Sequence, residues 1–229
     1  MSLTQRIQYS ARNLMLAAPL LGFVALSSCS NIPTRPPKPN PKQTSIAKAI
    51  FVNPYAKGSY DHFRADPSYP KTYKTYKNTD LLSRTNSGNS SIIVDLGLQR
   101  AFLMNNGQVA MDYPISSGTS KHPTSTGSFK ILEKIASDKR SSLYGKIYNA
   151  EGKVINYNAN SRKDKAPEGG RFEGALMAHW MRITWDGIGM HRGRVPRYPA
   201  SHGCIRTPGS IVPTVFRKVR VGTRVTVQR

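Results

Sequence analysis

The sequence predicts a mainly β fold with one or two short helices for residues 91–229. Short runs rich in Ile, Val, Phe and Tyr recur along this region, and turn-forming residues separate them, which is typical of strands. Asn105-Asn106-Gly107 divides two such runs and is a strong signal for a hairpin. Only residues 210–219 have the pattern of a helix, so helices are expected to be a minor part of this domain.

Each predicted strand is a short run that is either continuously apolar or alternates apolar and polar residues. The predicted strands cover residues 91–96, 100–104, 109–115, 127–132, 153–157, 175–184, 187–191 and 223–227. Residues 158–174 are polar and rich in glycine, so we expect a long loop there. In the predicted helix, Ser210 is the expected N-cap, and Pro213 falls in the first turn, where a missing N–H is tolerated.

Residues 1–28 have the organisation of a signal peptide. Two arginines and no acidic residue precede an apolar run over residues 14–26. This run is short for a bilayer span, which needs about 20 residues, and the arrangement is typical of a secretory signal. Leu26-Ser27-Ser28-Cys29 resembles a bacterial lipobox, which implies cleavage before Cys29 and attachment of lipid to it. The alternative is an ordinary signal peptide that happens to contain a cysteine.

The lipobox predicts an exported lipoprotein of the cell envelope. Its expected place is the periplasmic face of a membrane, through lipid on Cys29, and the outer membrane in a Gram-negative host. Residues 29–45 contain five prolines and are expected to form an extended, semi-rigid linker.

Residues 46–90 form a basic and aromatic extension that has two interpretations. The run from Lys71 to Lys77 alternates basic and aromatic residues and could bind a polymer, because aromatic faces stack on sugars and lysines attract acids. Alternatively, the extension wraps around the domain and packs its tyrosines against it. We favour this second interpretation.

The chain is strongly basic, with a formal net charge of +22 at pH 7. A basic surface favours an anionic partner such as nucleic acid, anionic lipid or an acidic cell-wall polymer. Export argues against nucleic acid, and no zinc-finger, RNP-like or helix-turn-helix pattern supports it. We therefore expect no nucleic-acid partner.

Cys204 is the strongest candidate for a catalytic residue. If Cys29 carries lipid, Cys204 has no partner for an internal disulfide, and an unpaired thiol outside the cytoplasm is usually retained for its reactivity. His191 and His202 are the candidate bases that could activate it. Gly203 suggests a sharp turn, and the consecutive amides of Gly203 and Cys204 could stabilise a developing oxyanion.

Four arginines lie close to this cysteine in the sequence: Arg192, Arg194, Arg197 and Arg206. Their charges are expected to lower the pKa of the thiol. Their guanidinium groups could also bind substrate carboxylates in pairs of hydrogen bonds. We assign a role to Arg206 more readily than to the other three, which could simply be a solvated loop.

Gly189-Met190-His191, followed by the run Ser201-His202-Gly203-Cys204-Ile205-Arg206, resembles the signature of L,D-transpeptidases with a YkuD-type catalytic domain. The run from Pro123 to Phe129 resembles an earlier motif of that family, with Ser125 in place of the usual proline. The resemblance covers residues 91–229 and implies a YkuD-like β-sandwich.

The resemblance also implies a reaction on peptidoglycan stem peptides. Cys204 would attack the third residue of a tetrapeptide stem and release D-alanine, with His191 as general base oriented by the Arg192 carbonyl. Amides around Gly203 would hold the oxyanion, and Ser201, His202 and Arg206 would contact the substrate. Arg192 stands where glycine or serine is commoner, so it could alter the choice of acceptor. The products would be 3–3 cross-links or protein attached to the wall, and no cofactor or metal is implied.

Three alternatives remain from the sequence. Water as acceptor would make the protein an L,D-carboxypeptidase or a related peptidoglycan hydrolase. A zinc site could use His191, His202 and Cys204, although no His-Glu-x-x-His motif is present. A non-catalytic anchor between membrane and wall would have no need of an unpaired thiol beside histidines.

Overall fold

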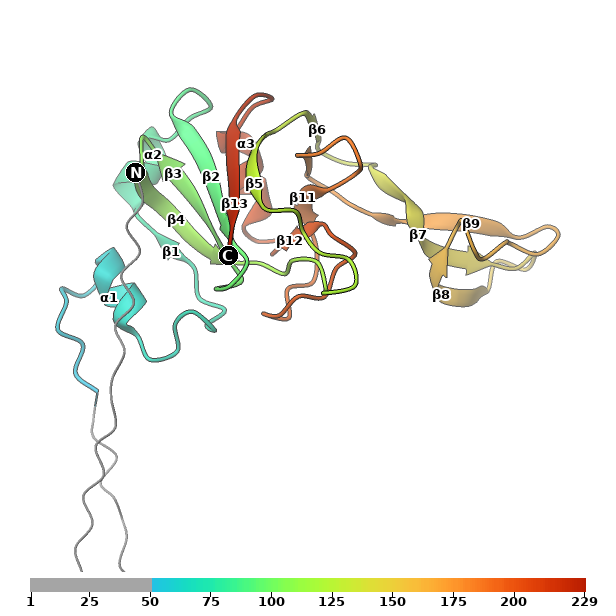
Figure 1. Ribbon diagram of the computed structural model, residues 1–229, viewed down its shortest axis with the longest axis horizontal. Coiled ribbons are helices and arrows are strands. Elements are labelled where there is room, and N and C mark those ends of the chain that lie inside the picture. The colour runs from blue at the N-terminus through green and yellow to red at the C-terminus, as the bar shows by residue number, and fades with distance from the viewer. Residues whose placement is uncertain (1–50) are drawn as a thin grey trace, which may run out of the picture. The chain divides into compact units, whose positions relative to one another are not determined.

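Most of the regular secondary structure is β-strand, arranged in three sheets, in residues 51–229, the part of the chain that the computed structural model describes (Figure 1). The first sheet contains, in spatial order, β1 (Tyr76–Lys77), β4 (Gln108–Pro114), β3 (Arg100–Asn105), β2 (Ser90–Asp95), β13 (Arg224–Gln228) and β5 (Gly127–Lys130). The second contains β12 (Ile205–Thr207), β11 (Gly189–Arg192), β10 (Trp180–Arg182) and β6 (Glu133–Ile135). The prediction of a mainly β fold is therefore confirmed.

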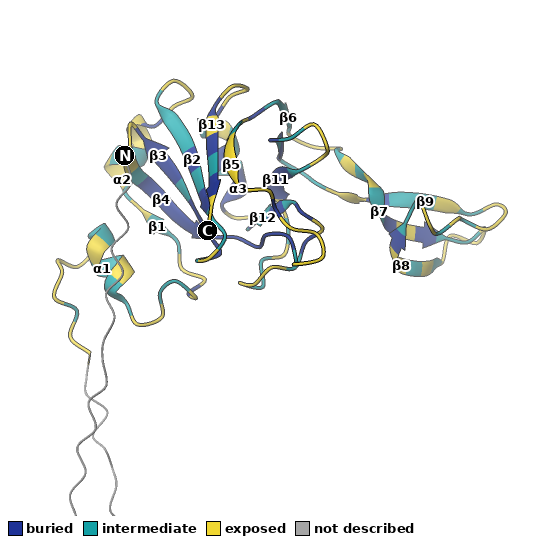
Figure 2. Ribbon diagram, in the orientation of Figure 1, coloured by how far each residue is buried: buried dark blue, intermediate teal, exposed yellow. Residues whose placement is uncertain are grey.

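The first two sheets and helix α3 (Val212–Lys218) share one apolar core, and we call this part of the molecule the body. Ile92 and Val94 on β2 are buried, as are Val225 and Val227 on the neighbouring strand β13. Because side chains alternate between the two faces of a strand, this spacing places one face of the sheet inward. Figure 2 shows this burial along β3, β4 and β13.

The third sheet projects from the body and is called the flap here (Figure 1). It contains β8 (Val154–Asn160), β7 (Arg140–Tyr148) and β9 (Arg171–Leu176), with β7 in the centre. The prediction of a loop over residues 158–174 is wrong at both ends, because β8 runs into this range and β9 begins within it. The central strand β7, which was not predicted, supplies backbone partners to both neighbours, so these strands do not depend on a strong apolar pattern.

The hairpin predicted around Asn105-Asn106-Gly107 is confirmed, since β3 and β4 pair on either side of it. Asn106 and Gly107 both have positive φ, 43° and 85°, as the favoured two-residue hairpin turn requires. The single strand predicted over residues 175–184 is divided between β9 and β10. His179, with φ of 56°, lies at the break, and this backbone conformation does not belong to a strand.

Helix α3 is the helix predicted over residues 210–219, but its cap differs. Ile211 occupies the N-cap position and no side chain caps the helix, so the prediction for Ser210 is wrong. The carbonyl of Pro208 accepts hydrogen bonds from the N–H groups of Ile211 and Val212, both at 3.0 Å. The preceding turn therefore supplies the partner that a capping side chain would have provided.

Residues before β2 form α1 (Tyr60–Ala65), β1 and α2 (Thr79–Arg84), and they pack on the body. Strand β1 extends the first sheet by pairing with β4. The phenols of Tyr60 and Tyr69 donate to Asp112 at 3.0 and 3.2 Å. This packing agrees with the second interpretation of the extension, although Tyr73 stays exposed.

No helix within residues 51–229 is long and apolar enough to cross a membrane. The predicted signal peptide, Cys29 and the linker over residues 29–45 lie outside the described residues.

Candidate active site

Two adjacent parallel strands bring His191 and Cys204 to one place. Strand β11 pairs with β12 so that Met190 lies opposite Ile205 and His191 lies opposite Arg206. Cys204 immediately precedes β12, so this register places it beside the first residue of β11. His191 and Cys204 both line one cavity of about 290 Å³.

The body and the flap both contribute to the wall of this cavity. The predicted site residues Ser201, His202 and Arg206 line it together with His191 and Cys204. Further lining residues come from β10, from the β10–β11 turn and from the flap: Trp180, Arg182, Asp186, Gly187, Ile188 and residues 140–144. The structure therefore brings five predicted residues together and adds a wall that sequence reasoning did not identify.

The His191 ring is buried and oriented by the main chain. Its Nδ1 atom lies 2.7 Å from the carbonyl oxygen of Arg192. A carbonyl can only accept, so Nδ1 carries the proton and Nε2 is free to accept one. Burial lowers the pKa of His191 to about 4, with a further lowering by Arg206, and the Arg192 carbonyl only partly opposes this. The imidazole is therefore neutral at pH 7 and can act as a base.

Cys204 is partly buried, and its sulfur lies 3.7 Å from the carbonyl oxygen of Gly187. Burial raises the pKa of the thiol, while the Gly189 main chain and the charges of Arg206 and Arg182 oppose this only in part. The expectation that nearby arginines lower this pKa is therefore wrong in its net direction, because desolvation of the thiolate outweighs them. The pair consists of a neutral thiol and a neutral imidazole, which requires proton transfer during attack.

Gly203 forms the sharp turn before the nucleophile. Its φ is +107°, in the left-handed region that favours glycine. Its N–H donates to Ser201 Oγ at 3.2 Å, and Ser201 Oγ donates to the carbonyl oxygen of Cys204. Thr124 donates to the Gly203 carbonyl at 2.7 Å. This network fixes the turn, and an oxyanion at the Gly203 amide would share that donor with Ser201.

His202 faces the flap. Its ring stacks on Tyr144 of β7, with centroids 3.8 Å apart and an angle of 17° between the planes, and His122 lies 4.8 Å away. Burial lowers the pKa of His202, with smaller contributions from His122 and Arg206. Tyr144 was missed because residues 140–148 were left unassigned in the sequence analysis.

The side chains of Arg206 and Arg192 lie in different hollows. The main chain of Arg206 exchanges two hydrogen bonds with Ser116, at 2.8 and 3.0 Å, and its side chain lines the cavity. The Arg192 side chain lines a separate hollow with Arg194 and Gly209. The structure thus brings the carbonyl of Arg192, but not its guanidinium, to the site.

Within residues 51–229, no group of three or more His, Cys, Asp or Glu side chains is arranged to hold a metal ion.

Comparison with known proteins identifies similar domains. Residues 89–227 match the model of the YkuD family, described as the L,D-transpeptidase catalytic domain. No curated protein matches the sequence.

Several solved structures resemble this chain. The L,D-transpeptidase from Mycobacterium smegmatis is 21% identical, with a TM-score of 0.46, and the match covers 62% of this chain and 59% of that one. A mutant of the Enterococcus faecium L,D-transpeptidase is 28% identical, with a TM-score of 0.42, and the match covers 61% of this chain and 49% of that one. The L,D-transpeptidase from Xylanimonas cellulosilytica is 20% identical, with a TM-score of 0.45, and the match covers 63% of this chain and 62% of that one. The chain thus spans less than two-thirds of each of these structures.

Proposed function

Because this chain belongs to the YkuD family of L,D-transpeptidase catalytic domains, we propose that it transfers acyl groups between peptidoglycan stem peptides through Cys204. The observation that carries this proposal is the cavity shared by Cys204 and His191, in which the imidazole has a free Nε2 and a pKa of about 4. A thiol beside a neutral, oriented imidazole is the arrangement that nucleophilic acyl transfer requires.

In the first half-reaction, Cys204 Sγ attacks the carbonyl carbon of the third residue of a tetrapeptide stem. His191 Nε2 takes the proton from the thiol as the carbon–sulfur bond forms. The carbon–nitrogen bond then breaks, and the same proton passes to the departing amine of D-alanine. The product is a thioester on Cys204, and His191 is again neutral.

In the second half-reaction, an amine of a second stem attacks the thioester. His191 removes a proton from this amine and returns it to the sulfur, which regenerates the thiol. The new amide joins two third residues, which is a 3–3 cross-link. A lysine amine would instead attach a protein to the wall, and water would give a free tripeptide.

The charges around the cavity suit an anionic substrate. Arg182, Arg206 and Arg140 all line it, and Asp186 is the only acidic residue among its lining residues in the described part of the chain. Arg140 and Arg182 already pair with Glu173 and Glu133, both at 3.1 Å. Guanidinium groups bind carboxylates in bidentate fashion, so Arg206, which forms no ion pair within the described residues, is positioned to hold a carboxylate of the stem.

The test is product analysis. The purified full-length protein is incubated with disaccharide-tetrapeptides, and the products are separated and weighed by mass spectrometry. We expect loss of D-alanine together with a new dimer in the wild type, and no reaction in Cys204→Ala. His191→Ala should be slower by about 10²- to 10⁴-fold, the usual contribution of a general base.

Other outcomes of this experiment separate the alternatives. Tripeptide without dimer would identify a carboxypeptidase. No change in any sample, even with added amines, would contradict the enzymatic proposal and favour a non-catalytic anchor.

The proposed location is the cell envelope, at the periplasmic face of a membrane, with lipid on Cys29. The lipobox supports this location. Metabolic labelling with a radioactive fatty acid should mark the wild type and leave Cys29→Ala unlabelled. Label retained in Cys29→Ala would overturn the assignment of the lipidated residue.

A further inference from the structure

The segment over residues 66–74, which precedes β1, lies before the family match but is firmly held by the body. Arg100 is fully buried on β3 and donates to three carbonyl oxygens of this segment. These belong to Pro70 at 3.2 Å, Thr72 at 3.0 Å and Lys74 at 3.0 Å. The path of the segment is therefore set by one buried guanidinium group.

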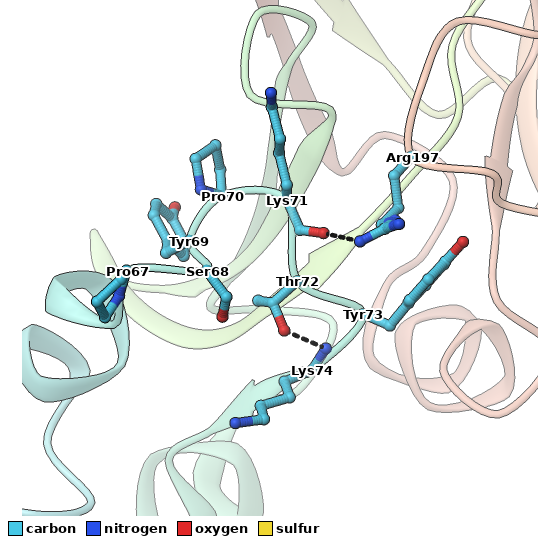
Figure 3. Close-up of a pocket in the computed structure, with 9 residues that line it drawn as sticks. All are labelled: Pro67, Ser68, Tyr69, Pro70, Lys71, Thr72, Tyr73, Lys74 and Arg197. Atoms are coloured by element: carbon cyan, nitrogen blue, oxygen red, sulfur yellow. Dashed lines mark hydrogen bonds between the residues drawn. The ribbon is translucent and has the colours of Figure 1, made fainter. Parts of the chain in front are cut away.

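Arg197 joins this segment to the loop over residues 193–200, which leads from β11 to Ser201 and is called the catalytic loop here. The Nη1 atom of Arg197 donates to the carbonyl oxygen of Lys71. The same guanidinium lies 4.1 Å from the centroid of the Tyr73 ring. In Figure 3, the Arg197 side chain reaches toward that carbonyl oxygen, whereas the Lys71 side chain points away from it.

Arg197 also has an unusual backbone. Its φ of +68° lies in the left-handed region, which non-glycine residues rarely adopt. Such a conformation persists when the surrounding contacts hold it. The two contacts with the 66–74 segment are of this kind, so their loss should allow the catalytic loop to relax.

Contacts that follow Arg197 continue toward the nucleophile. The carbonyl oxygen of Tyr198 accepts a hydrogen bond from Ser116 Oγ at 2.7 Å. The N–H groups of Ala200 and Ser201 both donate to the Ser117 carbonyl, at 2.9 and 3.0 Å. Ser201 then fixes the turn at the nucleophile through its hydroxyl, so a continuous set of contacts leads from the segment to that turn.

We propose that Arg197 is a positioning residue for acyl transfer. It holds the catalytic loop against the 66–74 segment, so that the turn carrying Cys204 keeps its place beside His191. The extension before residue 89 thereby acts on the active site without contacting substrate. This inference rests on the proposed function.

The test uses four single variants of the full-length protein, one double variant and one matched control. Arg197→Ala removes both contacts, and Arg197→Lys keeps a cation that can lie over the ring. Tyr73→Ala removes the ring, and Tyr73→Phe keeps it. Lys71→Ala is the control, because only the main-chain carbonyl of Lys71 receives Arg197.

Two measurements are made on each variant. The first is kcat and KM for the tetrapeptide donor. The second is the rate at which iodoacetamide alkylates Cys204 as a function of pH, with the labelled residue identified by peptide mass spectrometry. Alkylation needs no peptidoglycan, so it reports on the site even if the proposed substrate is wrong.

We expect Arg197→Ala to lower kcat by about tenfold with little change in KM, because small displacements of a nucleophile are costly. Its alkylation profile should shift, since the environment of the thiol changes. Arg197→Lys and Tyr73→Phe should recover most of the rate, and Lys71→Ala should equal the wild type. The double variant Arg197→Ala/Tyr73→Ala should be no slower than Arg197→Ala alone, because Arg197→Ala already removes the contact between the guanidinium and the Tyr73 ring.

A wild-type kcat and alkylation profile in folded Arg197→Ala would overturn the proposal. If that variant does not fold, a wild-type kcat and alkylation profile in folded Tyr73→Ala, which removes the ring under the guanidinium, would overturn it equally. If the alkylation profile of Arg197→Ala shifts as expected but even the wild type does not turn over stem peptides, the positioning role is supported and the proposed substrate is contradicted.

Discussion

The body and the flap are both built from short strands, but they are stabilised differently. The body encloses a shared apolar core, and within the described residues no side chain of the flap belongs to that core. The flap exposes several large apolar side chains, with Ile155 at 53%, Tyr157 at 67% and Leu176 at 53% exposure. The body therefore fixes the reacting groups, and the flap adds a wall whose side chains lie outside the shared core.

The two regions also differ in how deeply their ion pairs are buried. The side chains of Arg100 and Asp112 in the body pair and are both fully buried, and the phenols of two tyrosines donate hydrogen bonds to the Asp112 carboxylate. In the flap, Arg140 and Glu173 pair at 3.1 Å with side chains 47% and 36% exposed. A buried pair is costly to break because the remaining charge has no partner, whereas an exposed charge is solvated by water.

The largest predicted effect comes from breaking the buried pair. Asp112→Asn should lower the free energy of unfolding by about 3–5 kcal/mol, because it leaves the Arg100 charge uncompensated. Glu173→Gln in the flap should change it by about 0–1 kcal/mol. Urea denaturation of both variants checks this, and equal losses would contradict the distinction between the two regions.

A smaller effect is predicted where the flap touches the motif. Tyr144→Ala removes the ring that stacks on His202 and leaves this cavity-lining side chain free to move. Ordering His202 on binding should then raise KM for the stem peptide by about fivefold, because immobilising one side chain costs about 1 kcal/mol. The melting temperature should hardly change, because the flap lies outside the core. Tyr144→Phe and the exposed flap variant Ile155→Ala serve as controls, and a large loss of stability in Tyr144→Ala would contradict the proposed role of the flap.

The smallest predicted effect is that of moderate acid on the rate. His191 must be neutral to accept a proton, and its pKa is lowered to about 4. It is therefore neutral above this pH, and kcat/KM should fall by less than about twofold between pH 7 and pH 5 and by half near pH 4. A histidine with an ordinary pKa of about 6.5 would lose about 30-fold by pH 5. His122→Gln, measured alongside, removes the nearby exposed histidine from the profile.

Local sequence signals predicted the body well. The β3–β4 hairpin follows from Asn106 and Gly107, whose residue types suit positive φ whatever surrounds them. Helix α3 was located by its pattern, but its cap was not, since the partner came from Pro208 in the preceding turn. The motifs that contain His191 and Cys204 lie together because two parallel strands pair, which local signals alone do not reveal.

The flap and the electrostatics of the site could not be predicted in the same way. Strand β7 owes its place to pairing on both edges, and the contact between Tyr144 and His202 joins residues distant in sequence. The pKa of Cys204 was expected to fall because arginines lie near it in the sequence. Burial, which depends on the complete fold, reverses this direction.

The most direct test of the account is the intact mass of the protein during reaction with a tetrapeptide donor. Rapid acid quenching should reveal one added acyl group, equal to the donor without D-alanine, on the peptide that contains Cys204. Cys204→Ala should gain no mass, and His191→Ala should acquire the adduct far more slowly. Release of D-alanine by Cys204→Ala at the wild-type rate, or an adduct on another residue, would contradict the assignment of Cys204 as the nucleophile.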